Sequence, residues 1–510
     1  MDPRGRKLCY RSAIVGLLAL LGFVSYELSA LVPKANAIPA FARKYNFACN
    51  VCHVPGFPKL NDFGNLFRDQ GYQLGTDNDL PTFEAISMGF WPVSFRTTVG
   101  YQVANTRVDG QGVTTSGFGF TGLDVLSFGT LHRNIAFGLV YTPGLKEAGF
   151  GTGTSLDDNN LESAFVKILN LERFLGGSNN TYWLNLKVGK YELDVPFSEK
   201  RSPTLNTPFV MYHYVAGTAY TTVQNSLLPI TGGYANASVF GLGDNQPGAE
   251  LSGLIKTAVT GGYLRYSLNM LTTNGGSFSN DSGGYGRSAY FYGHVTQSFG
   301  GYGIVTGQRI GAFVVTGNAP TQCPASLVPQ LTATGTPNTV DNCGAAFPGT
   351  ATNGQPFTRF GGEVSLTYDG QWNLFGSVMH ALDSKNLVAS QSPTGVVNAA
   401  GLAFQNPSWN GGFVELDWYP TVLPFTNSPG WLFIYRYDAI RNVRQGDPSV
   451  LKSFNNVDSQ TAMVRYYIHQ STRTDIAVHA EYNWYKDKGV GVDGGNWYGQ
   501  TTLVGFDFAF

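Results

Sequence analysis

Charged side chains are scarce in this sequence, and neither sign is in excess. Lysine and arginine number 33, against 34 aspartates and glutamates in 510 residues. The charged fraction of 13% lies far below the roughly 25% that is usual in soluble domains. Because there is no basic excess, nothing in the composition indicates a nucleic-acid partner.

Long apolar runs are also missing, apart from one near the start of the chain. Several basic residues precede the apolar run 13–24, and Ala35-Asn36-Ala37 then supplies an A-x-A cleavage site. The run is shorter than the ~20 residues that a transmembrane helix needs. The pattern therefore predicts a secretory signal peptide over residues 1–37, and any membrane residence of the mature chain must come from strands.

Cysteines are few, and their positions divide them into three groups. Cys9 precedes the apolar run and is expected to leave with the signal peptide. Cys323 and Cys343 bracket a stretch rich in Pro, Thr and Asn, which in an exported chain predicts a disulfide in a surface loop. Two free thiols are the alternative. The last two cysteines lie in Cys49-Asn50-Val51-Cys52-His53.

This C-x-x-C-H pattern is the attachment signature of a c-type haem. Thiols at its two cysteines add to the haem vinyl groups, and the adjacent imidazole is the proximal iron ligand. A zinc site needs a second Cys/His pair nearby, and a thioredoxin-like site needs a βαβ context. The sequence offers neither, so we predict one covalent haem c bound by Cys49, Cys52 and His53, with His53 as the metal ligand and no catalytic residue.

The residues around the motif predict a small α-helical haem domain over 38–87. Leu60, Phe63 and Phe67 are spaced to form one apolar face of a helix, which Gly71 then ends. So short a domain buries little apolar surface alone. We expect the haem, and docking against or inside the mouth of the rest of the protein, to stabilise it.

The second axial ligand of the iron is not evident. Between residues 38 and 87 there is no methionine and no second histidine. Candidates elsewhere are Met88, Met211, His213, Met463, His469 and His479, of which Met463, His469 and His479 fall on faces that we assign to a lumen. For each of them packing or solvation is the commoner role, and a lysine, a water or an open position are further alternatives.

Residues 88–510 alternate apolar and polar side chains. In the last stretch Phe506, Phe508 and Phe510 share one face, while Asp507 lies on the other. About sixteen such strands can be counted, with mostly short and long connections in turn, as in transmembrane barrels. A half-exposed soluble sheet alternates equally well. We predict an all-β, antiparallel outer-membrane barrel with both termini periplasmic or lumenal, whose long connection 191–247 either enters the pore or hides two more strands.

The chain resembles the fused monohaem cytochrome–porins of the bacterial outer membrane, best known from iron-oxidising bacteria. The matching residues are Ala42-Arg43-Lys44-Tyr45, Cys49 to His53, Pro58-Lys59-Leu60-Asn61, Phe63-Gly64, Phe67 and Gly71-Tyr72. The order of leader, haem segment and barrel matches over essentially the whole chain, whereas only this N-terminal stretch matches in detail. The resemblance implies that Cys49, Cys52 and His53 hold the haem. It also implies electron transfer from an outside donor such as Fe(II) to a periplasmic c-type cytochrome or another soluble carrier.

Three functions follow as hypotheses. The preferred one is an electron conduit, in which the chain is an electron-transfer protein and, if the resemblance holds, an Fe(II)-oxidising cytochrome. The second is a solute-conducting porin with an accessory or redox-sensing haem. The third is export of electrons to an extracellular acceptor, because the residues do not fix the haem potential that sets the direction.

Overall fold

The computed structural model describes the following parts of the chain: 40–45, 47, 49–53, 58–75, 79–89, 91–108, 111–142, 161–176, 181–205, 207–214, 216, 242–243, 245–257, 261–272, 289–299, 308–319, 355–385, 405–420, 430–470, 474–490 and 495–509. The predicted signal peptide, Cys323, Cys343 and Phe510 lie outside these residues. In the described part, no helix is long and apolar enough to cross a membrane.

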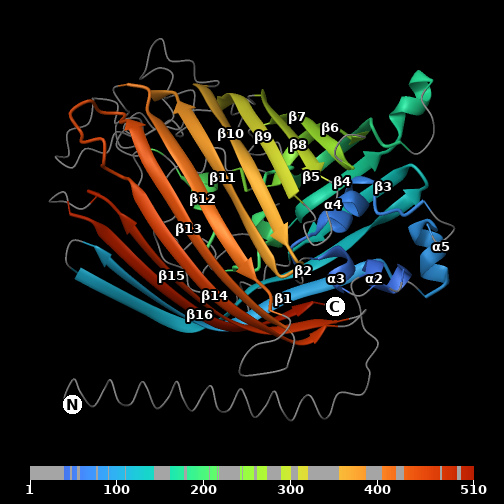
Figure 1. The fold of residues 1–510 in the computed structure, drawn as a ribbon, viewed down its shortest axis with the longest axis horizontal. Helices are drawn as coiled ribbons and strands as arrows, with labels where there is room; N and C mark the ends of the chain where they lie inside the picture. The colour runs from blue at the N-terminus through green and yellow to red at the C-terminus, as the bar shows by residue number, and fades with distance from the viewer. Residues whose placement is uncertain are drawn as a thin grey trace, which may run out of the picture.

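Sixteen antiparallel strands close into a single barrel (Figure 1). They are β1 (Val93–Val108), β2 (Gln111–His132), β3 (Ile135–Tyr141), β4 (Leu161–Ile168), β5 (Asn185–Glu192), β6 (Asn245–Thr257), β7 (Gly262–Thr272), β8 (Ala289–Phe299), β9 (Gln308–Ala319), β10 (Gln355–Tyr368), β11 (Trp372–Asp383), β12 (Ser408–Trp418), β13 (Trp431–Arg444), β14 (Val457–Gln470), β15 (Asp475–Asp487) and β16 (Trp497–Ala509).

Closure comes from the first and last strands. Each strand pairs with its neighbours in sequence, and β1 also pairs with β16 in a register that sets Arg96 opposite Ala509. A closed sheet leaves no unpaired edge to face hydrocarbon. The predicted fold class and strand count are confirmed. Most strand ends agree within four residues of the prediction. The exceptions are β2, which begins six residues before the predicted 117–128, β9, which begins five residues after the predicted start at 303, and β13, which ends five residues beyond the predicted end at 439.

Alternation divides the wall into two faces as predicted. On the outer face of β16, Phe506 and Phe508 are exposed, whereas Leu503 on the inner face is buried. On β15, His479 and Glu481 are buried inside the barrel. The polar residues therefore line the lumen, and apolar residues form the outer surface.

The two ends of the barrel differ. At one end, which we call the turn end, β1 begins, β16 ends and tight hairpins such as 369–371 join the strands. Asp369 and Gly370 both have positive φ, 53° and 60°, and aspartate and glycine tolerate this left-handed backbone better than most residues. The other end, the loop end, carries the connections 320–354 and 386–404.

One lumenal assignment is wrong. A register shift in β14 between Tyr467 and His469 pairs His469 with Ile476. Directly paired residues share a face, so His469 lies on the outer side with Ile476, and only Met463 and His479 stay on the inner side. A bulge inserts one residue, and the alternation of the sequence alone does not reveal it.

The N-terminal part is helical, with α2 (Ala40–Tyr45), α3 (Cys49–Cys52), α4 (Asp62–Asp69) and α5 (Thr82–Ser87). The predicted helix exists but begins later than expected. Asn61 caps α4, its Oδ1 accepting from the Gly64 amide at 2.8 Å. Leu60 therefore lies outside the helix and forms a bridge with His53 instead. Gly71, with φ 69°, follows the end of the helix as predicted.

The connection between β5 and β6 enters the lumen. Its described part includes η4 (Glu199–Arg201) and α6 (Val210–His213), and residues 193–214 are largely buried against inner wall residues. The first of the two expectations for 191–247 is confirmed for these residues. The possible extra strand at 238–241 lies outside the described residues. A further 3-10 helix, η3 (Leu171–Leu175), occupies the connection between β4 and β5.

Candidate functional site in the lumen

The C-x-x-C-H motif is fixed by the residues that follow it. The Asn61 amide donates to the Cys52 carbonyl at 2.9 Å, and the Asn61 Nδ2 donates to the Val51 carbonyl at 2.9 Å. Helix α4 packs directly on α3 at Gly64, where an added Cβ would lie 2.2 Å from the Cys52 carbonyl oxygen. The positions of Asn61 and Gly64 are therefore set by the close packing of the motif.

His53 is held in the protonation state that suits a metal ligand. Its Nδ1 lies 3.2 Å from the Lys59 carbonyl oxygen, which can only accept, so Nδ1 carries the proton and Nε2 the lone pair. Burial lowers the pKa of His53 to about 4. The imidazole is consequently neutral at physiological pH. Burial likewise raises the pKa of the half-buried Cys52 thiol to about 11, so this group is protonated.

The described residues of 49–75, which we call the docked segment, contact the lumenal wall on one side through Lys59. Its Nζ lies 2.5 Å from an Asp417 carboxylate oxygen on β12 and donates to Asn373 Oδ1 on β11 at 2.6 Å. The same ammonium lies 3.5 Å from the centre of the Phe375 ring. This contact joins residues more than 300 positions apart in the sequence.

On the opposite side, α4 is bound through Asp69. Its carboxylate lies 2.5 Å from Arg265 Nε on β7, and its backbone carbonyl accepts from Lys167 on β4 at 2.8 Å. Burial alone would raise the pKa of Asp69, but the guanidiniums of Arg265 and Arg68 outweigh it and lower that pKa. Asp69 is thus ionised and paired inside the barrel.

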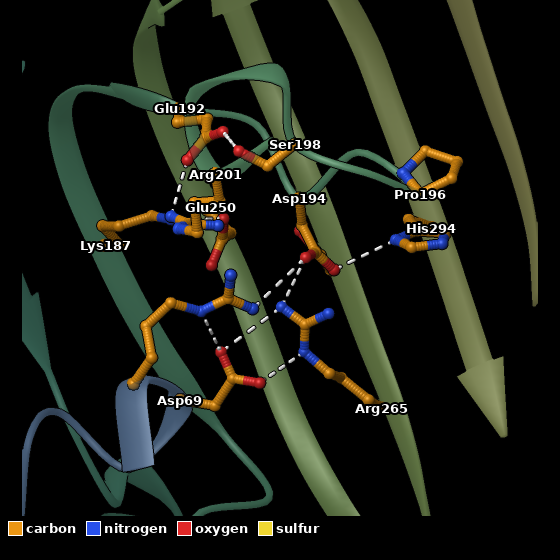
Figure 2. Close-up of polar contacts among 12 residues, drawn as sticks. Asp69, Lys187, Glu192, Asp194, Pro196, Ser198, Arg201, Glu250, Arg265 and His294 are labelled. Atoms are coloured by element: carbon orange, nitrogen blue, oxygen red, sulfur yellow. Dashed lines mark hydrogen bonds and ion pairs between the residues drawn. The ribbon is translucent and has the colours of Figure 1, made fainter. Parts of the chain in front are cut away.

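Asp194 extends this ion-pair network to the residues of 193–214, which we call the in-folded segment. It pairs with Arg265, lies 3.6 Å from Arg68 and accepts from His294 Nδ1 on β8 at 3.0 Å. Figure 2 shows Asp69 and Asp194 on opposite sides of the guanidinium groups, with His294 beyond Asp194. The docked segment, the in-folded segment and the wall therefore share one set of charges.

The in-folded segment also packs on the wall through apolar and aromatic side chains. The Phe209 ring stacks on Phe413 of β12 with centroids 4.1 Å apart, and Phe197 packs on Phe375 at 4.4 Å. Nearer the loop end, Tyr214 packs on Trp409 at 4.8 Å. Among the residues that the structure describes, this segment supplies much of the largest hydrophobic cluster.

A cavity of about 530 Å³ lies between the two segments and the wall. The docked segment contributes His53, Leu60 and Asn61, and the in-folded segment contributes Val195 and Phe197, among others. Five basic and three acidic residues line it: Lys59, Arg68, Arg201, Arg265, Arg309, Asp62, Asp194 and Glu415. Carboxylates just outside the lining pair with these cations: Asp417, Asp69, Glu192 and Glu363. His53 also lines an adjoining cavity of about 230 Å³.

None of the six predicted candidates for the second axial ligand lines either cavity. Met88 is 62% exposed, and Met211 is buried in the hydrophobic cluster. His213 pairs with Glu199 at 2.7 Å, and His479 with Asp507 at 3.0 Å. Met463 packs in a separate cluster on the wall, and His469 is on the outer face.

Sequence patterns do not predict the basic residues of the cavity. Lys59 belongs to the stretch that carries the family resemblance, which implies no role for it. Arg265 and Arg309 are on inward-facing positions of β7 and β9, and a search for charges on lumenal faces would have found them. Arg201 is in a connection without periodicity, so no pattern indicated it. In the described part of the chain, no three His, Cys, Asp or Glu side chains are grouped as a metal cluster.

No protein-family model matches the chain, and no curated protein sequence does. Among the solved structures that it resembles are an outer-membrane channel and a porin. The anion-selective porin from Comamonas acidovorans is 13% identical with a TM-score of 0.44, and 82% of this chain covers 99% of that one.

Two further solved structures are similar. The DcaP channel of Acinetobacter baumannii is 11% identical, with a TM-score of 0.42 and coverage of 81% of this chain and 96% of that one. OprB of Pseudomonas putida is 12% identical, with a TM-score of 0.42 and coverage of 84% and 96%. The architecture of this chain rests on its own strand pairing, and the likeness to porins is one of architecture alone.

Proposed function

We propose that this protein is an outer-membrane electron conduit, in which a haem c bound by Cys49, Cys52 and His53 lies inside the lumen of a porin-like barrel. The observation that carries the proposal is the position of His53. It is a neutral, half-buried imidazole next to a cysteine of the motif, and it faces a cavity between the barrel wall and the in-folded segment. A C-x-x-C-H sequence without a bound haem would have no reason to place its histidine at such a cavity.

The outer surface of the barrel supports the membrane location. At the turn end the aromatic side chains of β11 to β14 form a row around the outside. Ring centroids are 5.2 Å apart for Trp372 and Trp418, 5.3 Å for Trp418 and Phe433, and 4.8 Å for Trp431 and Tyr466. Aromatic girdles of this kind mark the membrane interface of transmembrane barrels, and an apolar belt lies beyond it.

The residues present fit a haem c. Its iron would be held by His53 Nε2, because Nδ1 donates to the Lys59 carbonyl and orients the ring. Basic side chains on the cavity lining, such as Arg201 and Arg309, suit the two negatively charged propionates of a haem. When bound, the group supplies one-electron redox chemistry. The chain binds it, separates it from lipid by the barrel wall, and holds it within reach of the turn end.

The direction of electron flow follows the resemblance. An outside donor such as Fe(II) delivers electrons, and a periplasmic c-type cytochrome or another soluble carrier accepts them at the turn end. Iron suits this arrangement because its insoluble ferric product is then formed outside the cell.

The experiment is to purify the exported protein under anoxia, record its haem spectrum and add Fe(II). We expect one covalent haem per chain that becomes reduced, and no haem in C49S/C52S, although the barrel still assembles. A native protein without covalent haem, or a haem that stays oxidised with Fe(II) and with other outside donors, would refute the proposal.

A second candidate is an anion-conducting porin with an accessory haem. The observation that favours it is the set of five basic side chains that line the cavity. It predicts a steady, anion-selective conductance of the native protein in planar bilayers. The conduit predicts that conductance is low while both segments stay in place.

A further inference from the structure

The outer surface of five neighbouring strands changes from apolar to polar toward the loop end. On β13 to β16 and β1, side by side around the wall (Figure 1), exposed apolar residues such as Tyr435 and Tyr482 give way to an in-register row of amides and aromatics. This row is Tyr437, Gln460, Trp484, Gln500 and Asn105. Such a row is typical of the level at which hydrocarbon ends.

One step further toward the loop end the surface becomes basic. The next in-register row runs through Asp458, Lys486, Tyr498 and Arg107. Arg107 is exposed, and Lys486 lies over the Tyr498 ring with its Nζ 5.6 Å from the centroid. Because adjacent strands are about 4.8 Å apart, the Cα atoms of Arg107 and Lys486 are separated by roughly 10 Å.

Two further cations gather around the single carboxylate. Arg441 of β13 pairs with Asp458 and donates to the Tyr437 hydroxyl at 3.2 Å. Lys488 Nζ lies 3.2 Å from the other Asp458 oxygen. Arg107, Arg441, Lys486 and Lys488 thus face one acid, which leaves an excess of three positive charges on this patch, the basic row. Asp458 orients two of these cations without neutralising the rest.

We propose that the basic row binds the phosphate groups of the phosphorylated glycolipid, lipid A, in the outer leaflet of the outer membrane. With the termini on the periplasmic side, the loop end faces outward, and lipids of that leaflet carry phosphates at the level where the apolar surface ends. Several cations spaced over neighbouring strands suit a headgroup with two phosphates. The inference rests on the membrane location in the proposed function and on the predicted periplasmic termini, and it is independent of the haem.

The test uses the full-length protein in detergent micelles and measures binding of diphosphoryl lipid A by native mass spectrometry. Dephosphorylated lipid A and phosphatidylglycerol are the comparison ligands. We expect R107Q/K486Q to bind diphosphoryl lipid A at least about tenfold more weakly than the native protein. The matched control K256Q/R173Q removes two exposed basic residues at the turn end and should bind like the native protein.

Equal binding of native protein and R107Q/K486Q, or equal binding of phosphorylated and dephosphorylated lipid A, would overturn the proposal. If phosphatidylglycerol binds as tightly as diphosphoryl lipid A, and its binding depends on Arg107 and Lys486 in the same way, the basic row is a site for glycerophospholipids. That result would overturn the proposal that its ligand is lipid A of the outer leaflet. Heat-modifiable electrophoretic mobility reports whether each variant is still a closed barrel. Haem content is measured in the same samples, so failure of the lipid site and failure of the electron conduit are separate results.

Discussion

The two segments that fill the lumen differ in how much of their contact with the wall is apolar. The docked segment binds the wall through the ion pairs of Lys59 with Asp417 and of Asp69 with Arg265, beside a small aromatic contact of Tyr72 with Phe128. The in-folded segment also has ion pairs, but it adds a large apolar cluster in which Phe209 stacks on Phe413. Apolar burial is additive and insensitive to pH, whereas buried ion pairs depend on every partner. We therefore expect the in-folded segment to behave as part of the barrel core and the docked segment as a separable insert.

Truncation of an aromatic ring in the in-folded segment should have the largest effect. Phe209 is almost fully buried, so Phe209→Ala removes its contacts and leaves a cavity that costs about 3–5 kcal/mol. We expect lower stability in urea unfolding from lipid vesicles and a larger single-channel conductance. Phe360→Ala on the exposed outer face is the control and should change conductance little. An unchanged conductance in Phe209→Ala would contradict the view that this segment closes the pore.

Removal of the partner of Lys59 should loosen the docked segment only. Asp417→Asn leaves a mostly buried ammonium without its carboxylate, at a cost of about 2 kcal/mol to docking. Hydrogen exchange should become faster in residues 58–75 and stay unchanged in 207–214. Asp458→Asn, which removes a carboxylate from the outer surface, is the control. Equal acceleration in both segments would show that the two are not separable.

The N-terminal cap of α4 should contribute less to the stability of the docked segment than the ion pair of Lys59 does. Asn61→Ala removes the acceptor of the Gly64 amide and the bond to Val51, at a cost of about 1 kcal/mol. The expected readout is faster exchange within α4. Asn61→Asp keeps the acceptor and should restore much of the protection. If both variants exchange like the native protein, the cap does not hold the motif.

Lowering the pH should have the smallest effect on the stability of the docked segment. The folded pKa of Asp69 is lowered from its usual 3.8, because Arg265 and Arg68 outweigh the effect of burial. A lowered carboxyl pKa adds stability that is complete above the unfolded value and is lost as the pH falls through the folded one. The protection of α4 against hydrogen exchange should therefore be unaffected by Asp69 from pH 7 to 5 and should fall below about pH 4. A loss of protection between pH 7 and 5 that is absent in Asp69→Asn would contradict this assignment.

The alternation of apolar and polar residues made the barrel wall predictable from the sequence. The contacts of the segments inside the lumen were not predictable in this way. A strand facing lipid on one side and a polar lumen on the other must alternate, so positions such as Phe506 and Asp507 predict both strand and face. The bulge that turns His469 outward inserts one residue and leaves no such trace. The contacts Lys59 to Asp417 and Asp69 to Arg265 join distant parts of the chain, and no local pattern encodes them.

We propose that electrons cross the barrel through a haem held by His53. The decisive experiment uses proteoliposomes that contain the native protein. An oxidised soluble c-type cytochrome is trapped inside them, and Fe(II) is added outside. We predict that the trapped cytochrome is reduced with the native protein but not with C49S/C52S, whose barrel lacks the attachment thiols. Equal reduction with both proteins would mean that Fe(II) itself passes through the lumen, and no reduction with either would mean that the barrel carries no electrons.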